Sequence, residues 1–353
     1  MILDRTRVET YLAMAREIGR TQPLFDVHVS PYEVIFCELE HAPNGEHPGV
    51  RSLEGASYGA PRAGALRIDD AAASEKLAQR AEVPAKFSKM MMRKQYAHLG
   101  PRVVADHMEL SGIGKSLLIP VHRPGADPAE QARLMFDVYG DDPRFAFAYC
   151  PRALGSEVEA TAELRDVAAL QPLMAVKVNA NIQAIDVATE PGRACLDHLM
   201  AACRGVALPM IVHGGVSRLL KDPRARSFAA LENFCSIPWR DAGVPVVVCH
   251  AGMFGSAPSE LDVLLPRLLR LMADNPNLLV DISGLSFTTL CAVLEQVDRT
   301  RIVFGSDALY FPQWSAVVKV LHALDQLGLP IRETFAMLAG TTPAQHIFCQ
   351  ERP

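Results

Sequence analysis

Four side chains that could bind a metal ion or move protons stand at or beside the ends of short apolar runs: His28, His213, His250 and Asp307. Imidazole nitrogens combined with one carboxylate oxygen are donors that zinc and similar divalent metals take from proteins. Each residue alone has a simpler reading, since a single histidine can be a core residue and an aspartate can cap a helix. The chemistry therefore depends on whether the fold brings the four together.

Eight apolar runs of strand length recur along the chain, several of them bounded by Gly, Pro, Asn or Asp. They cover residues 24–30, 115–121, 145–151, 173–179, 209–215, 244–252, 278–284 and 301–307. Segments with helical periodicity, such as 127–140, 193–206 and 260–275, lie between them, and this alternation indicates a parallel sheet. We therefore predict an α/β fold, a (β/α)8 TIM barrel, in which the ends of the strands converge on one face.

A long insertion follows the first predicted strand. A barrel of this type needs about 250 residues, and residues 31–114 separate the first two strands of this 353-residue chain. Within them, 41–65 hold five Gly and three Pro, which is typical of an irregular loop. Long loops on this face of a barrel usually carry function, so we predict a lid, within one barrel domain spanning 1–353.

Composition and charge exclude several classes of partner. A hydrophobic content of 49% supports a large buried core, and a net charge of -5 with scattered Lys and Arg argues against nucleic acid. The longest apolar runs are too short to cross a bilayer. The eight cysteines stand singly without a CxxC pair, which favours reduced thiols and a cytoplasmic location. We expect a small-molecule substrate, neither nucleic acid nor membrane as partner, and a homodimer.

The order of the motifs adds a family resemblance that spans the chain. DVH in the first predicted strand, VK in the fourth, IVHGG in the fifth, VCHAG in the sixth and FGSD in the eighth resemble the metal-dependent amidohydrolase superfamily. More narrowly, the chain is similar to the amidohydrolase-related branch that includes aminocarboxymuconate-semialdehyde decarboxylase. The resemblance implies that His28, His213 and Asp307 bind one divalent transition metal, zinc before manganese or iron. It also implies that His250 polarises the substrate or handles protons, with a place among the metal ligands as the alternative.

Ser30 departs from the pattern of this superfamily. It stands where the superfamily commonly has the second histidine of an HxH motif, and a serine hydroxyl is a poor zinc ligand. The alternatives are a weaker mononuclear site, a site completed by another group, and a barrel without metal. We favour the first, because polar groups gathered without a metal would have no evident reason to be there.

Lys177 stands where some members of the superfamily carry a carbamylated lysine that bridges two metals. As a plain amine it could instead bind a substrate carboxylate, which we favour over a second metal. Asn179 and Arg152 follow strand ends and are further candidates for substrate binding. Cys249 adjoins His250, but strand alternation turns it to the opposite face, which argues against a thiol nucleophile with a histidine base. The same alternation places Asp26, His28 and Ser30 on one face of the first strand.

The resemblance predicts a hydrolase that cleaves an amide, lactone or ester-like bond of a small molecule. Asp307 would act as general base on a metal-activated water, and His250 would polarise the substrate. The first alternative is a metal-dependent, non-oxidative decarboxylase or lyase that acts on an aromatic or enol-type acid. The second is a non-catalytic barrel used for binding or as a scaffold.

Overall fold

The computed structural model describes residues 2–30, 66–67, 101–121, 127–153, 155–217, 220, 222–308 and 311–348. The lid predicted at 41–65 lies outside the described residues, as does most of the insertion around it.

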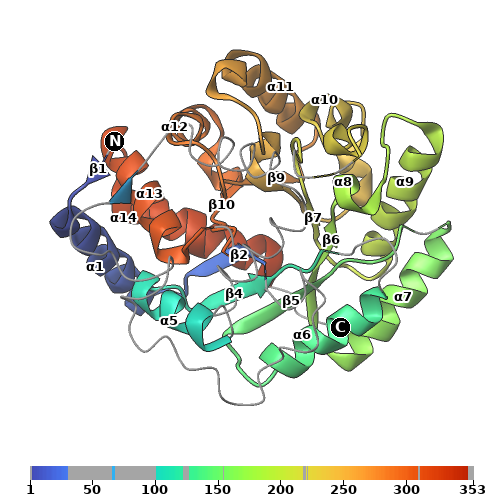
Figure 1. The fold of residues 1–353 in the computed structure, drawn as a ribbon, viewed down its shortest axis with the longest axis horizontal. Coiled ribbons are helices and arrows are strands. Elements are labelled where there is room, and N and C mark those ends of the chain that lie inside the picture. The colour runs from blue at the N-terminus through green and yellow to red at the C-terminus, as the bar shows by residue number, and fades with distance from the viewer. Residues whose placement is uncertain are drawn as a thin grey trace.

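Eight parallel strands form the centre of the fold, one within each of the eight predicted runs (Figure 1). In spatial order they are β2 (Phe25–Val29), β4 (Lys115–Leu118), β5 (Phe145–Tyr149), β6 (Leu173–Val178), β7 (Met210–Val212), β8 (Val246–Val248), β9 (Leu278–Asp281) and β10 (Ile302–Val303). Hydrogen bonds also join the two ends of this order, since the N–H of Val27 donates to the carbonyl of Phe304 at 3.0 Å. The structure thus confirms the predicted (β/α)8 barrel.

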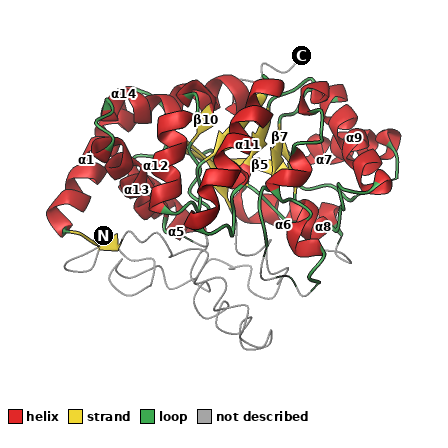
Figure 2. Ribbon diagram, turned by 90° about the horizontal axis from the view of Figure 1, so that it is seen from above, coloured by secondary structure: helices red, strands yellow, loops and turns green. Residues whose placement is uncertain are grey.

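An outer ring of helices encloses the strands (Figures 1 and 2). The longer helices are α1 (Arg5–Thr21), α5 (Pro101–Ser111), α6 (Pro128–Tyr139), α7 (Glu157–Leu170), α9 (Glu190–Gly205), α11 (Leu261–Asp274), α12 (Phe287–Gln296) and α13 (Gln313–Gln326). The shorter ones are α8 (Ala180–Gln183), α10 (Leu231–Phe234) and α14 (Ile331–Ala336). Side-chain caps begin several of them; for example, Ser156 accepts the N–H of Glu159 before α7. None of the described helices is long and apolar enough to span a membrane.

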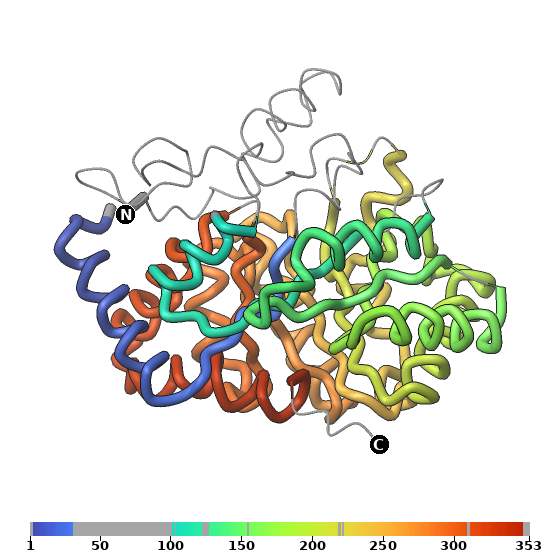
Figure 3. The backbone as a smooth tube through the Cα atoms, turned by 90° about the horizontal axis from the view of Figure 1, so that it is seen from below, coloured from blue at the N-terminus to red at the C-terminus, as the bar shows by residue number. Residues whose placement is uncertain are grey.

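The N-terminal segment lies outside the barrel. α1 packs against α5 and α13, next to the last helices of the chain (Figure 3). The strand β1 (Ile2–Leu3), which precedes α1 in the sequence, pairs antiparallel with β3 (Leu66–Arg67), which lies within the insertion. The helix α5 precedes β4 and is therefore the crossover between the first two strands of the barrel. The insertion at 31–114 thus includes one regular element of the barrel itself.

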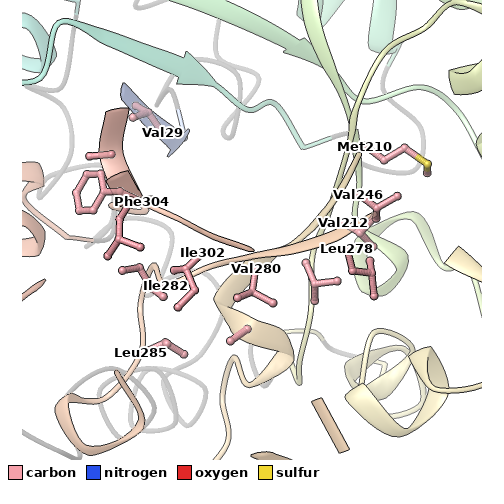
Figure 4. Packing of buried hydrophobic residues seen from close by; sticks show 14 of the residues in the cluster. Val29, Met210, Val212, Val246, Leu278, Val280, Ile282, Leu285, Ile302 and Phe304 are labelled. Atoms are coloured by element: carbon pink, nitrogen blue, oxygen red, sulfur yellow. The ribbon is translucent and has the colours of Figure 1, made fainter. Parts of the chain in front are cut away.

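Alternation along the strands separates two apolar layers. In β8, Val246 and Val248 belong to the layer between strands and helices, whereas Val247 belongs to the barrel interior. Figure 4 shows part of the outer layer, where strand residues such as Val280 and Ile302 pack together. The interior layer also contains Ile347 and lies next to Phe348, whose ring stacks on Phe25 at 4.4 Å between centroids. Phe25 begins β2, so apolar side chains fill the N-terminal end of the barrel and polar ones are left to the other end.

A β-bulge in β2 changes which of its side chains share a face. Pairing with β4 advances from Asp26 opposite Ser116 to Val29 opposite Leu118, so β2 holds one extra residue between these pairs. The Asp26 carboxylate faces α13, where it accepts a hydrogen bond from Gln313 Nε2 at 2.7 Å. The prediction that Asp26 shares a face with His28 was wrong, because strict alternation requires a strand without an extra residue.

The buried carboxyl of Asp26 gives a prediction for stability against pH. Burial raises its pKa from 3.8 to about 6, although hydrogen bonds from Ser306 and Gln313 act in the opposite direction. The native state therefore binds this proton more tightly than the unfolded chain, so the ionised carboxylate lowers stability above pH 6. This penalty disappears as the pH falls from about 6 towards about 4. About two pKa units correspond to about 3 kcal/mol.

We predict that Asp26→Asn removes this dependence. The free energy of unfolding by urea should be measured for both proteins at several pH values. As the pH falls from about 7 to about 4, the wild type should gain about 3 kcal/mol of stability relative to the variant. The neutral amide can be accommodated, because Gln313 Oε1 has no hydrogen-bond partner among the described residues and a rotated Gln313 amide could accept from it. Parallel pH profiles of the two proteins would contradict the prediction.

Candidate metal centre

The C-terminal ends of four strands bring together the four side chains singled out in the sequence. His28 lies in β2, His213 directly follows β7, His250 is the second residue after β8, and Asp307 follows β10; all four are at most 7% exposed. The ring of His250 lies 5.0 Å from that of His28 and 5.1 Å from that of His213, between centroids. His28 Nε2 lies 3.5 Å from Asp307 Oδ1. The three imidazoles and the carboxylate thus form one buried group.

Left-handed backbone conformations occur at two of these residues. The φ angle is 55° at His250 and 55° at Asp307, and Ala251 has φ 49°. Histidine and aspartate adopt this region more readily than most residues, but it is uncommon and costs free energy, and such conformations cluster at functional sites. The kink at His250 interrupts the alternation of side chains along β8, and the His250 ring lies beside the rings of His28 and His213.

Cys249 lies beside His28 in the barrel interior, where alternation from Val247 places it. The kink turns the next residue, His250, to the same side. The sulfur of Cys249 lies within 4.8 Å of a ring nitrogen of His28 and a carboxylate oxygen of Asp281. Since His250 also contacts His28, residues 249 and 250 do not face opposite ways. The prediction that Cys249 turns away from His250 was therefore wrong, because alternation does not continue through a left-handed residue.

Asp281, which the sequence reasoning missed, holds this group together from the end of β9. Its Oδ2 accepts a hydrogen bond from His28 Nδ1 at 2.9 Å, and its Oδ1 accepts the backbone N–H of His250 at 3.0 Å. Ser283 donates to the same Oδ1 from its N–H at 2.9 Å and from its hydroxyl at 2.5 Å. A carboxylate at the end of a predicted strand was the signal that singled out Asp307, and it would have found Asp281 in LLVD as well.

The His28 and Asp281 pair favours opposite charges. Burial alone would raise the pKa of Asp281, but the His28 ring and the hydrogen bonds that Asp281 accepts outweigh it and hold this pKa well below the usual range. Burial acts against a charged His28, yet the Cys249 sulfur and the Asp281 carboxylate raise the pKa of this histidine well above its usual value. Asp281 is therefore ionised and acts only as an acceptor, so the proton between the pair belongs to His28 Nδ1.

The other two imidazoles are held neutral. Burial lowers the pKa of His250, and burial together with the neighbouring His250 holds the pKa of His213 well below the usual value. His250 Nδ1 donates to the backbone carbonyl of Ser283 at 2.9 Å, which leaves the lone pair of a neutral ring at Nε2. A neutral His250 therefore accepts a proton at Nε2 more readily than it polarises a carbonyl. Of the two roles expected for it, this contact favours proton handling.

A second chain of hydrogen bonds supports His213. Asn181 Nδ2 donates to Ser217 Oγ at 3.0 Å and to the carbonyl of Gly215 at 3.0 Å. Ser217 Oγ in turn lies 3.2 Å from His213 Nε2, and its second lone pair can accept the hydrogen of a ring protonated at Nε2, which leaves the lone pair of a neutral His213 at Nδ1. This chain orients the His213 ring from the side of α8.

An aromatic ring and a glycine border the histidines. Phe254 lies 4.7 Å from His250 and 5.1 Å from His213, between ring centroids. Gly284 has φ 64°, and a Cβ there would lie 3.4 Å from His250 Nδ1 and 3.7 Å from Asp307 Oδ2. A larger residue at 284 would extend towards the two groups that we expect to move protons, so glycine keeps this side open as well as permitting the turn.

The remaining predicted residues have other contacts. Lys177 is 2% exposed and its Nζ donates to Cys249 Sγ at 3.1 Å. Arg152 forms an exposed ion pair with Asp127 at 3.1 Å, and Asn179 caps α8 by accepting the N–H of Ile182 at 3.1 Å. Ser30 is buried, and its N–H donates to the carbonyl of Ala308 at 2.9 Å. Roles of Lys177, Arg152 and Asn179 in substrate binding stay predictions.

Comparisons with known proteins agree with this fold. No curated protein matches the chain in sequence. An uncharacterised TIM-barrel protein from Bordetella bronchiseptica superposes with a TM-score of 0.55 at 12% identity, covering 92% of this chain and 97% of the other. An amidohydrolase from Burkholderia multivorans gives 0.54 at 14% identity, covering 92% and 98%. 4-Oxalomesaconate hydratase from Rhodopseudomonas palustris gives 0.54 at 13% identity, covering 92% and 95%.

The sequence itself carries the family assignment. The family model described as Amidohydrolase matches residues 93–345, from the segment before α5 to the last helical turn. The match includes three of the four converging side chains, His213, His250 and Asp307, as well as Asp281, whereas His28 precedes it. The superfamily expected from the order of the motifs is thereby confirmed, and this chain belongs to the amidohydrolase family.

Proposed function

We propose that the protein is a metal-dependent hydrolase that cleaves an amide, lactone or ester-like bond of a small molecule. The observation that carries this proposal is the 3.5 Å approach of His28 Nε2 to Asp307 Oδ1 within a buried group of three imidazoles. Membership of the amidohydrolase family supports it, since an enzyme of this metal-dependent superfamily needs such donors at the ends of its strands.

The residues fit one divalent transition metal. Ligand atoms in a tetrahedral zinc site lie about 3.3 Å apart when the bonds are 2.0 to 2.1 Å long, which is close to the 3.5 Å between His28 Nε2 and Asp307 Oδ1. His28 also gives its other ring nitrogen to a carboxylate, as metal-binding histidines usually do. His28, His213 and Asp307 would hold the ion, and zinc suits these donors, with manganese or iron as alternatives.

The side of His28 that faces Asp281 fits a metal less well. Asp281, Cys249 and His28 have ligand atoms within 4.8 Å of one another. Both oxygens of Asp281 already accept hydrogen bonds, and Cys249 Sγ accepts one from Lys177. A cation there would have to displace these donors, so we place the metal on the Nε2 side. Lys177, engaged with Cys249, does not enter the proposed centre, and one ion is proposed rather than two.

The chain's own residues would carry the proton transfers. A bound divalent metal supplies Lewis acidity, which polarises a carbonyl and lowers the pKa of water to about 7. Asp307 would accept the proton of the attacking water and pass it to the leaving group. His250, with its lone pair at Nε2, would accept the second proton of the water when the tetrahedral adduct collapses and the acid product ionises, and would then release it to solvent.

Phe254 supports a second candidate, a metal-dependent decarboxylase or lyase that acts on an aromatic or enol-type acid. Its ring lies against both His250 and His213, at 4.7 and 5.1 Å, and offers a flat surface on which an unsaturated substrate could stack. His250 or Asp307 would then deliver a proton to carbon. Screening small lactones, amides and aromatic acids, with carbon dioxide measured beside hydrolysis, distinguishes the two reactions.

Metal analysis tests the proposal. Protein purified without chelator is expected to hold close to one divalent transition metal per chain, and His28→Ala should lose most of it. His198→Ala, on the outer helix α9, is the matched control and should keep the metal. If the wild type takes up no metal even after incubation with zinc or manganese, the hydrolase proposal fails and a binding or scaffolding barrel takes its place.

A further inference from the structure

Asp281 links two histidines that the proposed function gives different roles. It is 0% exposed and contacts His28 through one oxygen and the backbone of His250 through the other. We propose that Asp281 is a positioning residue that fixes the tautomer of His28, so that Nε2 presents a lone pair to the metal. The proposal rests on the proposed function only in placing a metal at Nε2; the tautomer itself is a property of the metal-free protein.

The two oxygens of Asp281 are not equivalent. Oδ1 accepts three hydrogen bonds: from the backbone N–H of His250 at 3.0 Å, from the N–H of Ser283 at 2.9 Å and from the Ser283 hydroxyl at 2.5 Å. The two backbone donors cannot reverse their direction, so whatever atom stands at this position must be an acceptor. Oδ2 is left to face His28 Nδ1, at 2.9 Å.

This asymmetry makes Asp281→Asn an informative change. The amide has the shape of the carboxylate, but only its oxygen can stand where two backbone N–H groups donate. Its NH2 group must then take the place of Oδ2 and donate to His28 Nδ1. The proton of a neutral imidazole would be forced to Nε2, where it occupies the position that the metal needs. The substitution thus reverses the tautomer without removing any volume from the site.

Ser283 strengthens the arrangement but does not decide it. Its hydroxyl lies 2.9 Å from His250 Nδ1 and 3.1 Å from His28 Nδ1, while it donates to Asp281 Oδ1. Because its single hydrogen goes to Asp281, the serine oxygen can only accept from the two rings. Removal of the hydroxyl leaves the contact between Oδ2 and His28 in place, so Ser283→Ala is the matched control.

The test reads the tautomer directly by nitrogen-15 NMR of histidine-labelled, metal-free protein, at a pH where the His28 ring is neutral. The wild type and Ser283→Ala should show His28 protonated at Nδ1, and Asp281→Asn should show it protonated at Nε2. Asp281→Ala, which offers neither acceptor nor donor, should give a mixture. The signals of the other histidines report whether each variant is folded.

Zinc affinity, measured by competition with a chelator, gives the second readout. Asp281→Asn should bind zinc about 10- to 100-fold more weakly than the wild type, and Asp281→Ala should lose less than Asp281→Asn. A merely structural role would make the alanine variant the worse of the two. The proposal is overturned if His28 carries its proton at Nε2 in the wild type, a result that needs no variant to fold. It is also overturned if Asp281→Asn keeps the proton at Nδ1.

These outcomes separate the proposal from the proposed function. If the wild type binds no zinc but shows the expected tautomers, the metal-dependent hydrolase fails while the positioning role of Asp281 stands. If zinc binds and the tautomer is unaffected by Asp281→Asn, the hydrolase stands and the positioning role fails.

Discussion

Replacement of Asp307 by Asn is expected to lower kcat by about 10²- to 10⁴-fold and to weaken metal binding at the same time. The carboxylate would be both a ligand beside His28 Nε2 and the base that takes a proton from water, and the amide can do neither well. The backbone should tolerate the change, since asparagine adopts the left-handed conformation of residue 307, φ 55°, at least as readily as aspartate.

Turnover and metal content should be measured together in this variant. Asp298→Asn is a suitable control, because that carboxylate caps a turn away from the site, where it accepts the N–H of Thr300 at 3.0 Å. Asp307→Asn protein with full metal content and near-normal kcat would show that Asp307 is neither ligand nor base. Full metal content with a large loss of kcat would assign it the base role alone.

Replacement of His250 by Asn should lower kcat by a similar factor, about 10²- to 10⁴-fold, but leave the metal in place. The imidazole would accept a proton at Nε2, and an amide has no comparable basic nitrogen. Asparagine also suits the backbone here, where φ is 55°, and the N–H that donates to Asp281 is kept. The loss should therefore come from chemistry rather than from folding.

The metal content of this variant decides between two roles for His250. His198→Asn on α9 controls for the loss of an imidazole elsewhere in the fold. If His250→Asn empties the site while the control keeps its metal, His250 is a ligand. In that case the proton-handling role falls, and a centre with a second metal and a carbamylated Lys177 becomes the better interpretation.

The barrel and the positions of its strand-end residues follow from local signals in the sequence. Apolar runs such as VPVVV mark strands buried on both faces, and helical periodicity between them requires parallel pairing. Because strands of a barrel end on one face, His213, His250 and Asp307 had to converge once the strands were correctly placed. These conclusions need only the periodicity of the apolar residues and the order of the strands along the chain. The structure confirms the convergence.

Only the tertiary structure decided which atoms of these residues meet. The bulge in β2 turned Asp26 towards α13, and the left-handed kink after β8 brought His250 to the side of the strand on which Cys249 lies beside His28. Both features depend on contacts with neighbouring strands, so they cannot be recognised from the hydrophobic periodicity of the sequence. Asp281 and His28 are 253 residues apart, and their hydrogen bond exists because barrel closure places β9 and β2 near each other. Sequence order fixes the face on which such groups lie, whereas their pairing depends on the three-dimensional register of the closed sheet.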